Sequence, residues 1–306
     1  MKMSVILCTH NPRQDYLTRV LSALRQQTIS KKAWELLLID NASDEVLSKR
    51  CDLSWHPHGR IIRENKPGLT QARMRGIKES KGAILIFVDD DNVLKKNYLN
   101  ESLKICQKKP FIGAFSGECL PVTEGTINKE QAKHLGALAI RYVKQERWFN
   151  FPGHSDSMPY GAGMVLRKEV GLKYLTKIKK SKLSKSLDRN GTSLSCHGDL
   201  DMASTAFQLN LAVGIFPQIK LHHLIPQSRL REDYLIQLKR DATESKCIYE
   251  YLLEKKLPTI PKPLWRSPGR LLLWIRTNSF GRKIMAAERK GCLTAREKIT
   301  QATKNK

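Results

Sequence analysis

The stretch Ala83-Ile84-Leu85-Ile86-Phe87-Val88-Asp89-Asp90-Asp91-Asn92 joins an apolar run to three consecutive carboxylates. The six residues 83–88 predict a strand buried on both faces, because a half-exposed strand would alternate apolar and polar side chains. The acidic triplet, Asp89 to Asp91, follows this run directly. The sequence therefore predicts a buried strand that ends on a concentrated negative charge.

Similar apolar runs precede this strand, and helical patterns separate them. The other runs are Ser4–Cys8, Leu36–Ile39 and the weaker Ile61–Ile62, and the helical patterns are Leu17–Gln27 and Leu69–Glu79. This alternation predicts an α/β fold with parallel strands in a doubly wound sheet. Ligands bind such sheets at the carboxyl ends of the strands, so we expect Thr9, Asp40 and Asp89 on one rim.

The second half of the chain is less regular. We expect helices at Lys129–Arg147 and Arg231–Glu254, and a strand over Gly214–Pro226. Residues 149–163 are rich in Pro, Gly, Ser and aromatic residues, as in a binding loop. The six lysines of Lys173–Lys185 predict a mobile, solvated stretch.

Composition narrows the function without deciding it. A chain of 306 residues that is 41% hydrophobic can bury a large core, which excludes a disordered protein. Its net charge of +25 attracts anions: nucleic acid, an acidic membrane surface or phosphorylated substrates. The seven cysteines lack CxxC spacing, which argues against a zinc site or disulfide framework and for a reducing compartment.

Targeting signals and membrane spans are not expected. The N-terminus runs straight into a strand pattern without the features of a signal peptide, and no apolar run reaches the ~20 residues of a membrane helix. We expect a cytoplasmic location, with peripheral attachment to the inner face of the plasma membrane as an open alternative.

The C-terminal residues 261–306 carry twelve Lys and Arg against two Glu. Basic and apolar residues alternate there; the apolar ones are Leu264, Trp265, Leu271, Leu272, Leu273, Trp274, Ile275 and Phe280, and the basic ones include Arg266, Arg270, Arg276, Arg282 and Lys283. Two interpretations stay open: an interfacial helix on an anionic membrane, and a packed helix with a solvated charged face.

The acidic triplet suits a divalent cation. Adjacent carboxylates repel one another unless a cation shares them, and Mg²⁺ and Mn²⁺ prefer oxygen ligands that bridge to substrate phosphates. In an extended segment residues i and i+2 point the same way, so Asp89 and Asp91 can face one ion, with Asp90 as the middle residue. The competing interpretation is a solvated acidic turn.

Four motifs in order resemble family 2 glycosyltransferases of the GT-A fold. They are Ser4–Asn11, Leu36–Asp44, Asn65–Gly76 and the acidic triplet. Weaker similarity continues through Pro159–Met164, Gly198–Asp201 and Leu221–Pro226, so the resemblance covers roughly residues 3–226.

The resemblance implies a fold and a division of the chain. The fold is a Rossmann-like, mostly parallel central sheet flanked by helices, with a helical, basic C-terminal extension. Residues 1–226 would form the glycosyltransferase domain, with a nucleotide-sugar half at 1–110 and an acceptor half at 111–226. Residues 227–306 would form the helical basic region.

The resemblance also assigns roles to single residues. Those expected at the donor are Thr9, Asn11, Asp40, Gly68, Arg73, Asp89 and Asp90, and those at the Mn²⁺ or Mg²⁺ are Asp89, Asp91 and His223. A helix N-cap competes for Asp40, and an ordinary exposed helix position competes for Arg73. His222 leaves the register of His223 open, since alternation sends the two side chains to opposite faces.

A carboxylate is needed to take the proton of the acceptor hydroxyl. By the resemblance, Asp199 matches the general base of the family. The family commonly has two adjacent acidic residues at this place, but His197-Gly198-Asp199 contains only one, so Asp201 stays open as an alternative. The residues expected at the acceptor are Trp148, Tyr160, Gly161 and Asp201.

The resemblance therefore implies an inverting glycosyltransferase with a nucleotide-sugar donor and a saccharide or lipid-linked acceptor, in cell-surface polysaccharide or glycolipid synthesis. A nucleotidyltransferase is the alternative enzyme, although residues 9–13 lack the glycine of a phosphate loop. A nucleic-acid-binding protein is the third hypothesis, but it gives the triplet no role, so we expect no nucleic acid partner.

Overall fold

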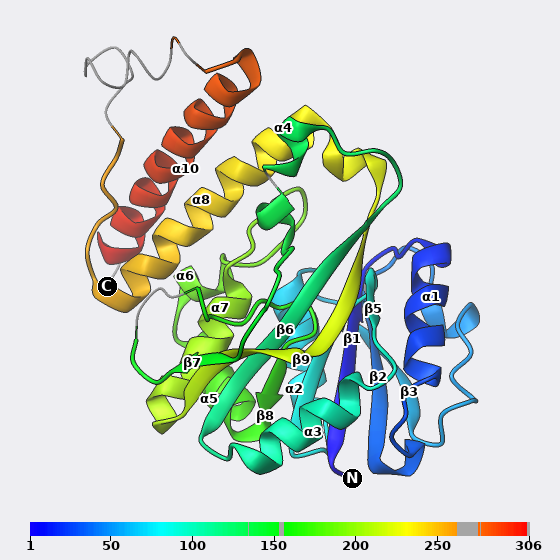
Figure 1. Ribbon diagram of the computed structural model, residues 1–306. Helices are drawn as coiled ribbons and strands as arrows, with labels where there is room; N and C mark the ends of the chain where they lie inside the picture. Colours follow the sequence, from blue (N-terminus) through cyan, green and yellow to red (C-terminus); the bar gives the residue numbers. More distant parts are fainter. Residues whose placement is uncertain (134, 153–155, 262–274, 276, 305–306) are drawn as a thin grey trace.

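The computed structural model describes residues 1–133, 135–152, 156–261, 275 and 277–304. Within them nine strands form one sheet in the order β3-β2-β1-β4-β8-β6-β9-β5, and β7 pairs with the beginning of β9 (Figure 1). The strands are β1 (Met3–Thr9), β2 (Trp34–Asn41), β3 (Gly59–Glu64), β4 (Ile84–Asp89), β5 (Asn92–Leu94), β6 (Ile112–Thr123), β7 (Arg147–Phe149), β8 (Val165–Arg167) and β9 (Ala212–Ile225).

Helices surround this sheet. The α-helices are α1 (Gln14–Arg25), α2 (Leu69–Glu79), α3 (Tyr98–Lys108), α4 (Lys129–Ala132), α5 (Lys168–Lys179), α6 (Lys182–Lys185), α7 (Gly198–Ala203), α8 (Glu232–Glu254) and α10 (Ser279–Lys304). Short 3₁₀ helices are η1 (Lys31–Ala33), η2 (Leu47–Lys49), η3 (Leu135–Leu138), η4 (Ser204–Leu209) and η5 (Gln227–Leu230).

The predicted parallel strands are present in the first half. β1 pairs in parallel with both β2 and β4, and β2 pairs in parallel with β3. Every residue of β4 from Ile84 to Val88 is buried, as its unbroken apolar run predicts. The α/β fold class with a helical C-terminal region is confirmed.

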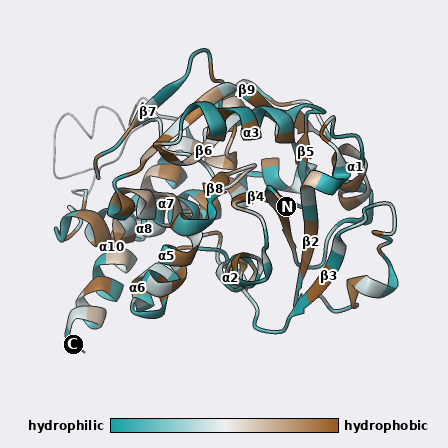
Figure 2. Ribbon diagram, turned by 90° about the horizontal axis from the view of Figure 1, so that it is seen from below, coloured by the Kyte–Doolittle hydropathy of each residue, from teal (hydrophilic) through white to brown (hydrophobic). Residues whose placement is uncertain are grey.

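Both faces of the sheet are covered by helices. Along β1, Val5 and Leu7 belong to the core cluster that contains α1 and α3, while Ile6 and Cys8 belong to the cluster that contains α2 and α5. Figure 2 shows the helices on the two sides of the sheet. Burial on both faces explains why β1 is apolar without alternation.

The second half makes the sheet mixed. β8 runs antiparallel between β4 and β6, and β5 and β7 run antiparallel to β9, whereas β6 and β9 are parallel to each other. The antiparallel pairing of the short β5 with the end of β9 brings the chain just after the acidic triplet against Leu221–His223.

Two expected elements differ from the structure. Within Lys129–Arg147 only α4 and η3 are helical among the described residues, and an irregular segment leads to β7. The lysine-rich Lys173–Lys185 is predominantly helical, in α5 and α6, because Tyr174, Leu175 and Ile178 are buried beneath the charged face. The helix over Arg231–Glu254 is confirmed as α8.

The described C-terminal part is a packed helix. α10 lies along α8, with Phe280 and Ile284 against Leu235. This favours the packed interpretation for Phe280. The interpretations of residues 264–274 and of Arg276 lie outside the described residues, and Ile275 is exposed.

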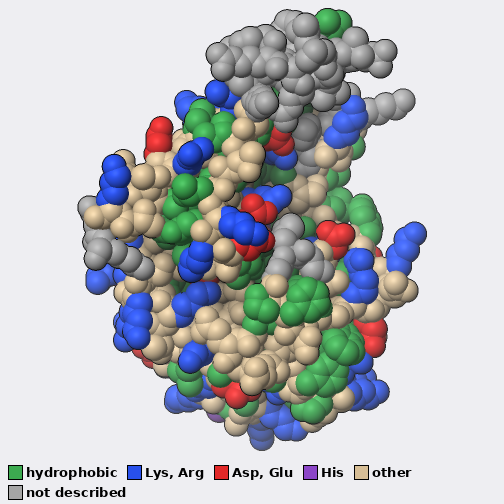
Figure 3. Space-filling model, turned by 90° about the vertical axis from the view of Figure 1, so that its left-hand side faces the viewer, with side chains coloured by type: hydrophobic (Ala, Val, Ile, Leu, Met, Phe, Trp, Pro, Cys, Tyr) green, Lys and Arg blue, Asp and Glu red, His purple; other side chains and the backbone are tan. Residues whose placement is uncertain are grey.

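No helix among the described residues has the length and apolar content needed to cross a bilayer. Figure 3 shows Lys and Arg side chains dispersed over one face, among hydrophobic and acidic ones. On that face the positive charge acts as a general field instead of a single basic patch.

Candidate active site

The parallel strands bring polar residues to one rim. In their register Thr9 lies opposite Asp40, and Cys8 lies opposite Asp89. The Thr9 hydroxyl donates a hydrogen bond to Asp90 Oδ2, which joins the end of β1 to the acidic triplet. The predicted juxtaposition of Thr9, Asp40 and Asp89 is therefore present in the fold.

Asp91 is the most enclosed member of the triplet. Its Oδ2 lies 2.8 Å from Arg229 Nη1 and 3.3 Å from His223 Nε2, and its Oδ1 accepts a hydrogen bond of 2.8 Å from Asn92 Nδ2. Asp89 and Asp90 are half-buried, whereas Asp91 is buried. Asp90 thus contacts Thr9, and Asp91 contacts the basic side chains of His223 and Arg229.

The strand pairing settles the register of the two histidines. Asn92 pairs with His223 across β5 and β9, which brings His223 to Asp91, while His222 pairs with Val93 and is half-exposed. His223 Nδ1 donates to the carbonyl oxygen of Leu138 at 2.9 Å. Because a carbonyl can only accept, Nδ1 carries a proton, and the other ring nitrogen, Nε2, faces Asp91.

Neighbouring charges separate the pKa values in this cluster. Burial acts to raise the pKa of Asp91, but His223 and Arg229 outweigh it and lower the pKa below its usual range. Burial acts to lower the pKa of His223, but Asp91 outweighs it and raises the pKa to about 10. Burial and the charge of Asp91 raise the pKa of Asp90 to about 7.

Asp91 offers an oxygen ligand, and His223 Nε2 beside it would become a nitrogen ligand if a cation displaced its proton; Nδ1 of His223 is anchored as in many metal sites. Among the described residues no group of three His, Cys, Asp or Glu side chains could hold a metal ion. A cation that takes its remaining ligands from a substrate diphosphate and water fits such a pair.

Arg229 was not predicted from the sequence. It lies in η5, directly after β9, and occupies the position beside Asp91 and His223. The sequence around Arg229 does not distinguish it from the other Lys and Arg residues, which total 54 with it, so its place in the site is known only from the fold.

The second predicted carboxylate, Asp199, lies at the start of α7. Its Oδ2 accepts a hydrogen bond of 2.5 Å from the Gly161 N–H, and its Oδ1 accepts one of 2.8 Å from the Leu200 N–H. Burial raises the pKa of Asp199 to about 6, against the opposing charge of Arg73. Asp199 is therefore ionised at neutral pH and still a usable base.

Gly161 separates Asp199 from Arg73. A Cβ atom at position 161 would lie 2.6 Å from Arg73 Nη2 and 3.1 Å from Asp199 Oδ2. A side chain would therefore displace one of the two groups. The glycine allows the guanidinium from α2 and the carboxylate from α7 to meet.

Arg73 is buried, which excludes the exposed helix position. Its Nη1 lies 3.0 Å from Asp188 Oδ1, and Asp188 also accepts a hydrogen bond from Thr70. Asp188 was not singled out in the sequence; it links α2 to the segment before α7. This ion pair fixes the guanidinium next to Gly161.

Three other predicted donor residues are engaged in loop contacts. Asp40 accepts hydrogen bonds from Arg63, Ser43 and Leu47. Asn11 exchanges two hydrogen bonds with Asp44. Gly68, with φ at +119°, donates its N–H to Asn41 Oδ1. These contacts hold the loops that border the rim.

The four predicted acceptor residues divide into two pairs. Tyr160 and Gly161 adjoin Asp199. The Asp201 carboxylate is buried and lies 2.6 Å from Lys177 Nζ of α5. Trp148 pairs with Gly214, nine residues before His223 along β9, and its ring packs against Phe111. Asp201 thus contacts α5, and the Trp148 ring contacts Phe111.

Comparison with known proteins identifies the family. The sequence profile described as glycosyl transferase family 2 matches residues 4–170, more than half of the chain. The chain belongs to glycosyl transferase family 2. The match contains β2, β4, the triplet and all of β1 except Met3, whereas Asp199, His223 and Arg229 lie beyond it.

Two glycosyltransferases are similar in sequence to part of this chain. An uncharacterised glycosyltransferase of Haemophilus influenzae is 26% identical over 51% of this chain and 57% of its own length. The putative teichuronic acid biosynthesis glycosyltransferase TuaG of Bacillus subtilis is 26% identical over 40% of this chain and 49% of its own. The matches thus span about half of these two relatives.

A solved structure extends the family likeness to the whole fold. The crystal structure of S. aureus TarS 1–349 superposes with a TM-score of 0.54 at 14% identity, over 98% of this chain and 92% of the other. At this identity the likeness concerns the fold, and it includes the GT-A architecture and the C-terminal region.

Proposed function

We propose that the protein transfers a sugar from a nucleotide-diphosphate donor to an acceptor hydroxyl, with inversion at the anomeric carbon. The observation that carries the proposal is the position of Asp199. It is a half-buried carboxylate held by two backbone N–H groups and separated by one glycine from Arg73. Family membership supports the reaction class.

Asp199 would act as the general base. With a pKa of about 6 it is ionised at pH 7, and its oxygens each keep a lone pair beyond the hydrogen bonds to Gly161 and Leu200. Asp199 would take the acceptor proton as the acceptor oxygen attacks the anomeric carbon. The bond from that carbon to the diphosphate breaks in the same displacement, which inverts the configuration.

The leaving diphosphate needs positive charge. Asp91 and His223 would hold Mn²⁺ or Mg²⁺, whose charge would neutralise the diphosphate; a nitrogen ligand suits Mn²⁺ better. Asp89 would complete the site from the rim. Arg229, 2.8 Å from Asp91, and Arg73 supply fixed positive charges on either side of the triplet.

We also propose that the two halves divide the substrates. Residues 1–110 would bind the nucleotide sugar, with Thr9, Asp89 and Asp90 at the rim, Arg73 nearby, and Asn11, Asp40 and Gly68 in the bordering loops. Residues 111–226 would bind the acceptor, with Tyr160 and Gly161 beside Asp199. The basic region 227–306 would favour a lipid-linked or polymeric saccharide at the inner face of the plasma membrane, in cell-surface polysaccharide or glycolipid synthesis.

The test is a panel of nucleotide sugars. We expect one or a few to raise the melting temperature with Mn²⁺ or Mg²⁺ present and not with EDTA, because a ligand that binds only the native state stabilises it. Turnover of that donor should release a nucleoside diphosphate. Release of pyrophosphate from a nucleoside triphosphate would instead identify a nucleotidyltransferase and contradict the proposal.

A further inference from the structure

A cavity of about 280 Å³ adjoins Asp199 on the acceptor side. Tyr160 and Leu200 line it. The Leu200 N–H donates a hydrogen bond to the Asp199 carboxylate, and so does the N–H of Gly161, the residue after Tyr160. A group bound in this cavity would therefore lie next to the base. The volume is slightly below the ~300–1,000 Å³ of small-molecule sites, which suits a group the size of one sugar unit.

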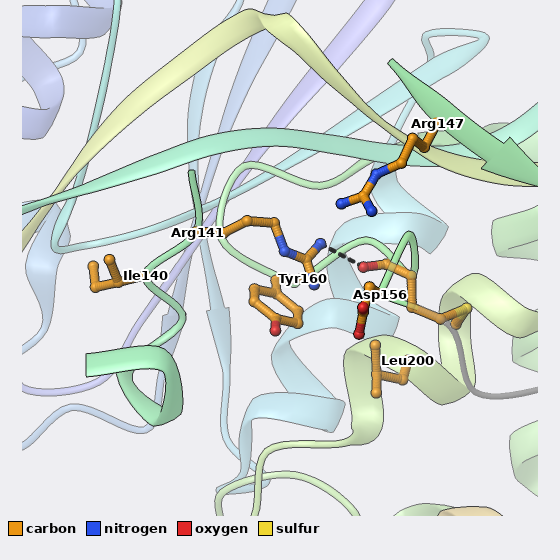
Figure 4. A pocket seen from close by; sticks show the side chains of 7 residues that line it. Ile140, Arg141, Arg147, Asp156, Tyr160 and Leu200 are labelled. Atoms are coloured by element: carbon orange, nitrogen blue, oxygen red, sulfur yellow. Dashed lines mark hydrogen bonds between the residues drawn. The ribbon is translucent and has the colours of Figure 1, made fainter. Parts of the chain in front are cut away.

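Arg141 is held at one wall of this cavity. Its guanidinium lies 3.5 Å from the centre of the Tyr160 ring, and its Nη1 donates a hydrogen bond of 2.6 Å to the Met158 carbonyl oxygen. These two contacts orient the planar group and leave other N–H donors for a ligand. Figure 4 shows the stacking and the hydrogen bond.

Arg147 reaches the same cavity from β7, a different segment. In Figure 4 its guanidinium points toward Arg141 and Asp156. Among the residues that the structure describes, Arg147 forms no ion pair or side-chain hydrogen bond, and Asp156 pairs with neither arginine. The two guanidinium groups repel each other across the cavity, and an anion between them would relieve this repulsion.

We propose that Arg141 and Arg147 bind an anionic group of the acceptor, a phosphate or a sugar carboxylate, and that Asp156 accepts hydrogen bonds from its hydroxyls. Both anions present oxygens that a guanidinium can bind in bidentate fashion, which neutral sugars do not. This inference rests on the proposed function, because it takes the cavity beside Asp199 as the acceptor site. It assigns the acceptor to the acidic saccharides or sugar phosphates.

The test uses binding of small probes, so it does not require the donor to be known. The arginine Nε–Hε signals of the ¹⁵N-labelled full chain are recorded by NMR during titration with methyl glucuronide, glucose 6-phosphate and methyl glucoside. The Arg147 signal is assigned from the Arg147→Gln variant. We expect it to shift with one or both anionic probes and to stay unchanged with methyl glucoside.

Variants then separate a specific site from the general positive field. We expect Arg147→Gln to weaken binding of the anionic probe roughly tenfold or more, with Arg147→Lys in between, because a charge-assisted hydrogen bond is lost. Arg25→Gln, an exposed arginine of α1, removes the same charge and should leave binding unchanged. Arg141→Gln serves as a second variant whose fold is checked by circular dichroism.

Several outcomes would overturn the inference. Equal shifts with methyl glucoside, equal losses in Arg25→Gln, or absence of binding by both anionic probes each contradict an anion site. The glucuronide and phosphate arms distinguish the two sources of negative charge. A shift confined to Arg73 and Arg229 would place the anion at the donor site, which also contradicts the inference and leaves the proposed function standing.

Discussion

Two aspartates of this chain, the buried Asp91 and the half-buried Asp199, have opposite pKa shifts. Asp91 lies against His223 and Arg229, which lower its pKa, whereas burial raises the pKa of Asp199 to about 6. Groups whose environments separate their pKa values in this way take different chemical roles. We therefore expect Asp91 to bind a cation and Asp199 to accept a proton.

Replacing Asp199 by Asn should reduce turnover by roughly 10²–10⁴-fold, because the general base is lost while the backbone contacts can remain. Donor binding, measured by calorimetry, should change little. Asp201→Asn is the matched control on the same helix: its carboxylate pairs with Lys177, so turnover should persist. Equal turnover in the Asp199 variant, or loss in the Asp201 variant alone, would transfer the role of base to Asp201.

The pH dependence of transfer should follow Asp199. Only the ionised carboxylate can take a proton, and its pKa is about 6, so kcat should fall as the pH drops through about 6 and level off above 7. The measurement is kcat at saturating donor from pH 5 to pH 8. An acid limb near the ordinary carboxylate pKa of about 4 would show that Asp199 does not control the step.

Asp91→Asn should weaken metal-dependent donor binding by roughly 10–100-fold or more, because loss of even an outer-shell partner of a metal ligand has an effect of that size. The readout is the Mn²⁺-dependent rise in melting temperature with donor. The variant also leaves His223 and Arg229 without their partner, so its melting temperature without ligand is measured as well. Donor binding that resists both EDTA and this substitution would remove the metal from the proposal.

The packing of α10 on α8 attaches the C-terminal helix to the rest of the protein. Cys292, Ala295 and Ile299 of α10 belong to the same buried cluster as Ile248 of α8. At the contact, a Cβ atom on Gly291 would lie 2.4 Å from the Arg240 carbonyl oxygen. The close approach of the two helices therefore depends on glycine at this position.

Gly291→Ala should lower the free energy of unfolding by about 1–3 kcal/mol, because backbone atoms of α8 cannot move aside as a flexible side chain could. The helix propensity of alanine would have the opposite sign, so destabilisation reports the clash. Urea unfolding measures it. Gly136→Ala is the control, since nothing lies within 4 Å of a Cβ there; a stability change equal in the two variants would contradict this account.

For the molecule as a whole, the site is composite and the surface is strongly basic. Asp91 comes from the segment after β4, His223 from β9 and Asp199 from α7, so the cluster exists only when both halves share one sheet. The net charge of +25 provides a long-range attraction for anions.

The full chain should co-sediment with vesicles that contain phosphatidylglycerol and not with pure phosphatidylcholine vesicles. Its positive charge is attracted to the anionic surface, and salt should weaken this attraction because it screens exposed charges. The comparison is made at low salt and at physiological salt. Equal binding to both vesicle types would contradict an electrostatic attachment, and absence of binding to either would contradict peripheral membrane association.

The parallel strands, the rim and the acidic triplet could be predicted from the amino-acid sequence alone. These features are local: unbroken apolar runs define β1, β2 and β4, and the residues that follow each run must lie at the same edge of a parallel sheet. For the same reason α2 and α8 were predicted from helical spacing, as was the helical character of the C-terminal region.

Which side chains meet could be seen only in the three-dimensional fold. The β5–β9 pairing selected His223 over His222, η5 brought Arg229 to Asp91, and α7 turned Asp199 to Gly161 and Asp201 to Lys177. Such contacts join residues far apart in the chain, and their charges and burial set the pKa values. Periodicity in a sequence records which face of an element is buried, but not which distant polar group faces it.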